Sequence, residues 1–244
     1  MVKKKQDGFW ETIQTLLYAI VIALVIRSLA FEPFNIPSGS MRPTLLVGDY
    51  LFVSKFSYGY SRHSFPMSIL PFNGRFFFQE PERGDVIVFK LPRDNKTDYI
   101  KRLIGLPGDR IQMKAGRLFI NEQLVIREPV EDFEYSDKYD IIRTVQQFKE
   151  ILPDGKEHYI LEESDDRWFD NTREFKVPEN HYFMMGDNRD NSEDSRSRVG
   201  FVPKENLVGR AELLFFSTNG RASILEVWKW PYAIRYSRLF NAID

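Results

Sequence analysis

The sequence predicts a mainly β protein with a single N-terminal transmembrane helix and an inserted smaller second lobe. Three observations support this fold class. The first is an apolar segment from about residue 9 to residue 30. The second is a series of short β-branched and aromatic runs after Phe31, each bounded by Gly, Pro, Asn or Asp. The third is a stretch rich in Asp, Glu and Arg, residues 112–180, which differs from the sequence on either side.

The N-terminal apolar segment has the length and flanks of one membrane span. At about 1.5 Å per residue it extends roughly 33 Å, enough to cross a bilayer core of about 30 Å. Three lysines at residues 3–5 precede it. The positive-inside rule therefore predicts a cytoplasmic N-terminus and places everything after Phe31 on the outer side of the membrane.

A cleavable signal peptide is the main alternative for this segment. Ser28-Leu29-Ala30 is a small-x-small sequence of the kind that is cleaved. However, the apolar run is longer than the roughly 7 to 15 residues of a signal-peptide core, and Arg27 stands directly before the site. A buried soluble helix is also disfavoured, because few polar residues recur with the helical period. We therefore expect a retained span.

The body after the span is predicted to consist mostly of strands. Runs typical of strands occupy residues 49–56, 85–90, 99–106, 117–120 and 181–185. One short helix is expected at residues 145–152, because Pro153 and Gly155 follow it.

The changes in composition predict four parts of the chain. They are the cytoplasmic N-terminus and span (1–31), a β core (32–111 plus 181–215), the inserted lobe (112–180) and a C-terminal membrane-proximal tail (216–244).

Composition excludes several classes of function. The 244 residues include no cysteine, so disulfides, thiol catalysis and thiolate metal sites are ruled out. The formal net charge is −1, and no basic patch indicates a nucleic-acid partner.

Ser40 and Lys101 are the two residues whose surroundings most clearly indicate chemistry. Ser40 lies among Pro, Gly and small hydroxyl residues in the segment 36–44, which favours a tight turn. Lys101 lies in an apolar strand-like run that ends in a Pro-Gly turn. Taken singly, the serine would be a turn residue and the lysine a solvated charge. Together they suggest a hydrolase in which an amine activates a serine.

A third segment, residues 186–196, is a polar loop directly after an apolar strand. It does not fit a calcium loop of the EF-hand type, because its acidic residues lack the required spacing and terminal Glu. Its Asn, Asp, Ser and Arg residues are suited to a rigid loop held by side-chain to backbone bonds and by Asp to Arg pairs. We therefore expect it to support a site.

These segments together resemble the bacterial type I signal peptidases in identity and order. The matching motifs are Pro37-Ser38-Gly39-Ser40-Met41-x-Pro43-Thr44, Gly48-Asp49, Tyr99-Ile100-Lys101-Arg102 with Gly105-Leu106-Pro107-Gly108-Asp109, and the loop from Gly186 to Arg196. Four motifs in one order are highly specific. The likeness covers the span and the β-rich catalytic core, whereas residues 112–180 and the C-terminal tail match only in general placement.

The resemblance implies a serine endopeptidase of the bacterial inner membrane that removes signal peptides from exported preproteins after small-x-small sites, typically Ala-x-Ala. It assigns Ser40 as the nucleophile, Lys101 as the general base, and Ser38 with the Ser40 N–H as the oxyanion hole. It gives Ser192 the task of orienting the lysine amine. The supporting residues would be Asp187, Arg189, Asp194 and Arg196. Well-known Gram-negative members have two spans, whereas this chain shows one. No cofactor, metal or obligate protein partner is expected.

The proposed chemistry requires Lys101 to be neutral. An exposed lysine has a pKa near 10.4, so it would be protonated at neutral pH. Burial against apolar neighbours such as Ile100, Leu103 and Ile104 would lower that pKa. A nearby carboxylate would counteract the effect, so a hydroxyl such as that of Ser192 is a better partner. Arg102 is expected to be a structural or membrane-facing charge.

The β character predicts how a substrate would bind. A signal peptide would lie extended along an exposed strand edge, with alternate residues in shallow pockets. The candidate pocket walls are Phe34, Ile36, Ile100 and Leu103. The lipid bilayer is a further expected partner, because several apolar and aromatic groups suit a membrane interface or, alternatively, core packing. These groups are residues 65–72, residues 76–78, Trp228, Trp230 and Tyr232.

Three rival functions are weaker. A Ser-His mechanism would need one of the three histidines, His63, His158 or His181, and none has a setting like that of a serine-protease histidine. The penicillin-recognising enzymes pair Ser-x-x-Lys on one helix, but Pro43 stands at that position here. A non-enzymatic, membrane-tethered β module that binds exported chains would tolerate the loss of Ser40 and Lys101.

Overall fold

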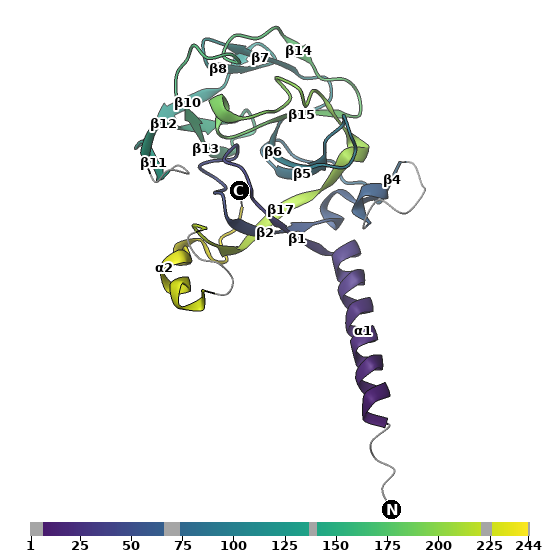
Figure 1. The fold of residues 1–244 in the computed structure, drawn as a ribbon. Coiled ribbons are helices and arrows are strands. Elements are labelled where there is room, and N and C mark those ends of the chain that lie inside the picture. The colour runs from purple at the N-terminus through teal and green to yellow at the C-terminus, as the bar shows by residue number, and fades with distance from the viewer. Residues whose placement is uncertain (1–6, 66–73, 137–140, 221–225, 244) are drawn as a thin grey trace, which may run out of the picture.

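The N-terminal segment is one long helix that projects away from a β-rich body (Figure 1). The computed structural model describes residues 7–65, 74–136, 141–220 and 226–243. Helix α1 (Asp7–Leu29) contains the candidate span Gly8–Leu29, which has a mean hydropathy of 1.9 and no buried share. In the described part of the chain it is the single helix long and apolar enough to cross a membrane. The expected apolar helix is therefore confirmed.

The body is built on a seven-stranded antiparallel sheet, which confirms the mainly β class. Its strand order is β1-β2-β17-β5-β6-β15-β16. The strands are β1 (Phe31–Asn35), β2 (Asp49–Ser54), β5 (Val86–Lys90), β6 (Asp98–Gly105), β15 (His181–Met185), β16 (Val202–Pro203) and β17 (Leu207–Ser217).

Two four-stranded sheets, built from residues 110–176, lie above the main sheet and away from α1 in Figure 1. One has the order β14-β7-β8-β9, and the other has the order β10-β12-β11 with β13 also paired to β12. Their strands are β7 (Arg110–Lys114), β8 (Arg117–Ile120), β9 (Gln123–Leu124), β10 (Ile126–Pro129), β11 (Phe133–Ser136), β12 (Ile142–Ile151), β13 (Glu157–Glu162) and β14 (Phe175–Lys176). A small pair, β3 (Tyr60–Ser61) and β4 (Arg75–Phe76), completes the strands. The division into four parts by residue range stays a prediction.

The expected strands are found, but the expected helix at residues 145–152 is wrong. This segment belongs to β12, the longest strand of its sheet. It pairs with β10, β11 and β13, so its backbone groups are bonded to neighbouring strands on both sides. Its Gln, Lys and Glu residues are good helix formers, but pairing with neighbouring strands overrides this local preference. Pro153 and Gly155 instead form the turn to β13.

The C-terminal tail returns to the main sheet. Arg238 donates to the buried carboxylate of Asp49 at the start of β2, and Phe240 N donates to the carbonyl of Leu214 in β17. The short helix α2 (Trp230–Ala233) lies below the main sheet in Figure 1, on the side toward which α1 projects. The tail is thereby fixed to the core.

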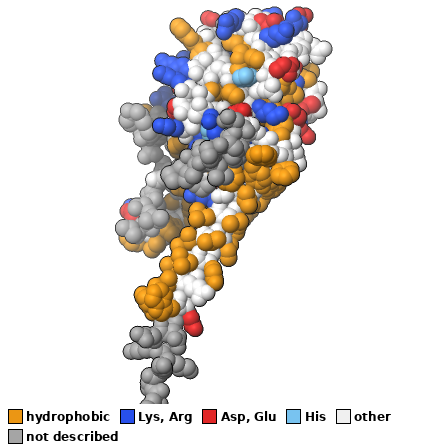
Figure 2. Space-filling view, turned by 90° about the vertical axis from the view of Figure 1, so that its right-hand side faces the viewer, with side chains coloured by type: hydrophobic (Ala, Val, Ile, Leu, Met, Phe, Trp, Pro, Cys, Tyr) orange, Lys and Arg blue, Asp and Glu red, His pale blue; other side chains and the backbone are white. Residues whose placement is uncertain are grey.

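Exposed hydrophobic side chains run the length of α1 and continue onto the adjoining face of the body (Figure 2). Trp228 and Tyr232 are 68% and 86% exposed, and Phe77 is 85% exposed. Residues 66–72 of the predicted apolar surface lie outside the described residues. The described aromatic groups therefore include several that are not core residues.

Candidate active site

Ser40 and Lys101 meet in the structure. The Ser40 Oγ and Lys101 Nζ atoms are 2.6 Å apart. Ser40 lies in the turn between β1 and β2, and Lys101 lies on β6, near the middle of the main sheet. The two residues that the sequence singled out are thus brought into hydrogen-bond contact from separate segments.

Apolar anchors hold the turn that carries Ser40. Met41 and Leu45 are completely buried and pack in one core cluster with residues of β2, β5 and β17. The Arg42 N–H donates to the carbonyl of Gly39, and the Leu45 N–H donates to that of Met41. Alternation of small polar residues with buried Met and Leu therefore fixes the turn to the core while Ser40 itself stays partly exposed.

Lys101 is deeply buried, with an exposed fraction of 3%. Besides Ser40, its Nζ contacts the carbonyl of Ile100 at 3.0 Å. Burial lowers the pKa of the Lys101 amine to about 8, although the negative charges of Asp194, Asp187 and Glu193 act in the opposite direction. The amine is therefore far closer to neutrality at physiological pH than an exposed lysine.

Ser38 lies on the open side of this pair. Its Oγ is 3.4 Å from Ser40 Oγ, and its side chain is exposed. A group that approaches Ser40 from solvent would therefore meet the Ser38 hydroxyl.

Ser192 is buried, and its hydroxyl lies close enough to Asp194 to help lower the pKa of that carboxyl. It lies against Gly186. A Cβ atom at position 186 would lie 2.2 Å from Ser192 Oγ and 2.5 Å from the carbonyl oxygen of Ser40. Glycine thus permits the close approach of the polar loop to the Ser40 turn. The orienting role of Ser192 stays a prediction.

Asp194 and Arg196 brace the polar loop from within. Arg196 Nε and Nη2 donate to the two carboxylate oxygens of Asp194 at 3.0 and 2.9 Å. Asp194 also accepts the Gly186 N–H at 3.1 Å. Burial alone would raise the pKa of Asp194, but Arg196 holds it below its ordinary value. This pair therefore ties the two ends of the loop together.

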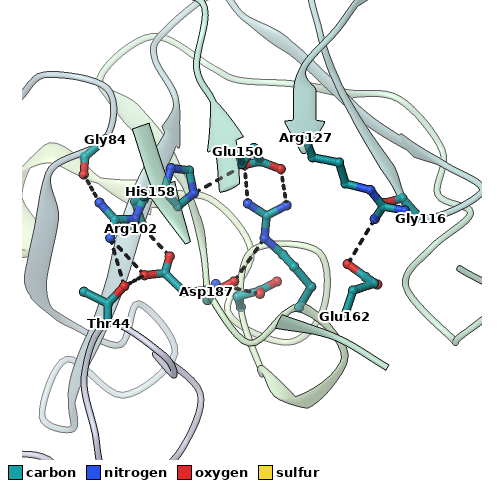
Figure 3. Close-up of polar contacts among 12 residues, drawn as sticks. Thr44, Gly84, Arg102, Gly116, Arg127, Glu150, His158, Glu162 and Asp187 are labelled. Atoms are coloured by element: carbon teal, nitrogen blue, oxygen red, sulfur yellow. Dashed lines mark hydrogen bonds and ion pairs between the residues drawn. The ribbon is translucent and has the colours of Figure 1, made fainter. Parts of the chain in front are cut away.

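Arg102 is a buried structural charge and does not face the membrane. It is 1% exposed and donates to both oxygens of Asp187 at 2.9 Å (Figure 3). It also donates to the carbonyl of Gly84, and the hydroxyl of Thr44 donates to Asp187 at 2.6 Å. This cluster joins β6, the polar loop and the end of the Ser40 turn.

Arg189 is held by a residue that the sequence analysis missed. Its two Nη atoms donate to the two oxygens of Glu150 on β12, and the buried ring of His158 on β13 lies 3.3 Å from the same carboxylate (Figure 3). Burial opposes the ionisation of Glu150, but Arg189 holds its pKa below the ordinary value. Only the alternation of β12 could have indicated this inward carboxylate, and that strand was mistaken for a helix.

The histidines have other partners. His181 Nδ1 contacts the carbonyl of Glu179, and His63 Nε2 accepts from Arg62. The nitrogen in contact with Ser40 Oγ belongs to Lys101.

The structure brings three of the four predicted pocket walls into one cluster and places the fourth in another. Phe34 and Ile100 pack against the core cluster that contains Ile36, whereas Leu103 belongs to a different cluster with residues of β5 and β15. Ile36 and Leu103 are buried, and Phe34 and Ile100 keep partial exposure.

A serine hydroxyl beside a buried amine is the arrangement of a serine hydrolase in which lysine replaces the usual imidazole base. The chain belongs to the signal peptidase family, peptidase S26, whose family model matches residues 9–216.

Named relatives agree with this membership. The chain is 44% identical over 242 residues to the signal peptidase I of Rickettsia typhi, a match that covers 92% of this chain and 90% of the relative. It is 43% identical to that of Rickettsia prowazekii, with the same coverage. A crystal structure of a signal peptidase I from Enterococcus faecalis V583 matches at 26% identity, covers 54% of this chain and 97% of its own, and gives a TM-score of 0.32.

Proposed function

We propose that this chain is a membrane-anchored serine endopeptidase that cleaves signal peptides from exported preproteins after small-x-small sites, with Ser40 as nucleophile and Lys101 as general base. The signal peptidase activity follows from family membership. The observation that carries the residue assignment is the 2.6 Å contact between the Ser40 hydroxyl and a buried amine.

The neutral amine of Lys101 would take the proton of Ser40 Oγ as this oxygen attacks the scissile carbonyl carbon. The oxyanion that forms would accept hydrogen bonds from the Ser40 N–H and the Ser38 hydroxyl. The protonated amine would then give its proton to the leaving amine of the mature protein. A water molecule, activated by the same amine, would release the signal peptide from Ser40.

The polar loop would keep this geometry rigid. Asp194 with Arg196 closes the loop at Gly186, and Asp187 with Arg102 ties it to β6 beside Lys101. Ser192 would orient the amine through its buried hydroxyl.

A strand edge beside Lys101 supports extended binding of the substrate. Strand β15 pairs with β6 only from Arg102 onward, whereas β5 pairs along residues 98–102. Among the described strands, residues 98–101 therefore have one unpaired side. A signal peptide added there would place successive side chains on alternate faces, with Phe34 and Ile100 as the candidate pocket walls that keep partial exposure.

The proposed membrane arrangement follows the charges and the aromatic groups. Helix α1 would span the bilayer with the lysines at residues 3–5 in the cytoplasm and the body on the outer side. The exposed Trp228 and Tyr232, near α2, would lie at the outer interface, where amphipathic rings are favoured.

The test is cleavage of a purified preprotein by the full chain in detergent. Wild type should cut once, after an Ala-x-Ala site, and Ser40→Ala and Lys101→Ala should give no product while their circular dichroism spectra stay unchanged. Cleavage at the wild-type rate by either variant would overturn the assignment, and cleavage that ignores replacement of the two alanines by large residues would overturn the specificity.

A further inference from the structure

Three carboxylates converge at the junction between β13 and the polar loop. Glu162 ends β13, Asp170 lies in the segment that follows, and Asp190 lies in the short helix η4 (Arg189–Asn191) of the polar loop. One oxygen of each lies within 4.8 Å of the others. Glu162 is 1% exposed and Asp170 is 0% exposed, while Asp190 keeps partial contact with solvent. The cluster is therefore buried with one open side.

The two buried carboxylates are incompletely satisfied. Neither oxygen of Glu162, nor Asp170 Oδ1, forms a hydrogen bond with any residue that the structure describes. The other oxygen of Asp170 accepts the Arg167 N–H. Asp190 Oδ2 accepts the N–H groups of Glu163 and Ser164 at 2.7 and 3.1 Å. Buried carboxylate oxygens without donors are rare, and a binding partner such as an ion or an ordered water is one explanation for them.

Neighbouring arginines do not supply that partner, because each binds another carboxylate. The pairs are Arg127 with Asp165, Arg189 with Glu150, and Arg196 with Asp194. Arg127 Nη1 comes within 3.8 Å of Glu162 Oε2, beyond hydrogen-bond distance, and donates instead to the carbonyl of Gly116 at 2.9 Å. Arg127 therefore gives Glu162 one long ion pair, and neither Glu162 oxygen gains a hydrogen bond from a described residue (Figure 3).

An uncompensated buried carboxylate must be neutralised. A bound proton is one way to neutralise it. A hard cation is the alternative, since carboxylate oxygens are its preferred ligands. Ca²⁺ accepts about six to eight oxygen ligands in a flexible arrangement, whereas Mg²⁺ demands near-ideal octahedral geometry and usually keeps several of its waters. A buried group of three carboxylates therefore favours Ca²⁺.

We propose that Glu162, Asp170 and Asp190 form a structural binding site for Ca²⁺. The ion would join β13 and the segment after it to η4, and so would hold the loop that also carries Arg189 and Ser192. The spacing of acidic residues within 186–196 does not indicate this site, because two of its three ligands come from elsewhere in the chain.

Direct binding is the first test. The full chain in detergent is treated with a chelator, dialysed and titrated with Tb³⁺, a hard ion that occupies calcium sites and luminesces when a nearby tryptophan is excited. Trp168, adjacent in sequence to the cluster segment, is the expected sensitiser. The signal should saturate at one ion per chain and be displaced by Ca²⁺. Absence of both a saturable Tb³⁺ signal and calorimetric Ca²⁺ binding would overturn the proposal.

Matched variants locate the site. Asp170→Asn removes a buried ligand, and Asp166→Asn removes an exposed carboxylate from the same segment. Calcium at about 100 times its dissociation constant should raise the Tm of wild type and of Asp166→Asn by roughly 5–10 °C, and should leave that of Asp170→Asn unchanged. A calcium-dependent rise in Asp170→Asn, or its loss in Asp166→Asn, would place any bound ion elsewhere.

Glu162→Gln is a second test, because Asp170→Asn could lose its calcium response simply by failing to fold. Glutamine mimics the protonated carboxyl, so in chelator this variant should melt at or above the Tm of wild type, yet gain nothing from calcium. Calcium affinity of wild type should rise with pH, because protons and the ion compete for the same carboxylates. A Glu162→Gln protein that is stabilised by calcium as strongly as wild type would contradict the proposal.

Discussion

Glu150 on β12 and Arg189 in the polar loop form a buried, bidentate ion pair, with Arg189 Nη1 2.9 Å from Glu150 Oε1. Each of the two residues is 1% exposed. The pair connects a sheet built from residues 110–176 to the loop that lies against Ser40. The stability of the site therefore depends on a residue far from it in the sequence.

Loss of one partner of this pair should be costly. Glu150→Gln leaves Arg189 buried without its counter-charge, so the free energy of unfolding should fall by about 3–5 kcal/mol. Denaturant unfolding measures the change. Glu157→Gln, an exposed change on the adjacent strand, is the control and should stay within about 0.5 kcal/mol of wild type. Equal losses in the two variants would refute a special role for the Glu150–Arg189 pair.

Replacement of the proposed base by a permanent cation should abolish its function. A guanidinium does not lose its proton near neutral pH, so Lys101→Arg should lower kcat by at least about 10²–10⁴-fold. Single-turnover cleavage of a preprotein gives the rate. Lys96→Arg, at an exposed position, should cleave at the wild-type rate. Substantial activity of Lys101→Arg would show that another group takes the proton.

The pH dependence of cleavage should report the pKa of the Lys101 amine. Because the pKa of Lys101 is lowered to about 8, the neutral fraction, and with it kcat, should rise through pH 8 and level off above it. The negative charge of Glu193 raises this pKa, so Glu193→Gln should move the profile to lower pH. A profile flat from pH 6 to pH 10, or one that moves upward in the variant, would contradict this assignment.

The buried amine should also reduce stability below its pKa. The ordinary pKa of lysine is 10.5 and that of folded Lys101 is about 8, so between these values the unfolded chain binds more protons and stability rises with pH. Lys101→Met should therefore be more stable than wild type by about 3 kcal/mol at pH 7, with the gain vanishing near pH 10.5. Unfolding measured at several pH values tests this, and a gain independent of pH would point to packing alone.

The close packing of Ser192 and Ser40 around Gly186 predicts that a larger residue at position 186 is harmful. A methyl group there would collide with Ser192 Oγ and with the backbone oxygen of Ser40, so Gly186→Ala must displace the turn or the loop. We expect a loss of about 1–3 kcal/mol in stability and about 10²-fold in kcat. Gly8→Ala, with nothing within 4 Å of the added carbon, is the control for both measurements. Wild-type activity of Gly186→Ala would show that the two segments need not touch.

The sequence predicted those parts of the site that depend on local pattern. The turn at Ser40 and the apolar strand of Lys101 each have their own residue signature, and both were placed correctly. Glu150 was missed because its inward direction depends on pairing with strands distant in the sequence. Arg102 was left open for the same reason, since its partner Asp187 comes from the far side of the inserted segment. The cluster of Glu162, Asp170 and Asp190 likewise exists only through the fold.

The burial of Lys101 implies that its amine has different properties in the folded and the unfolded chain. In an extended chain that amine is surrounded by water and keeps its proton at neutral pH. The proposed base would therefore come into being only when β6, the Ser40 turn and the polar loop have closed around it. A chain that has not yet folded would therefore be inert toward other polypeptides and toward itself.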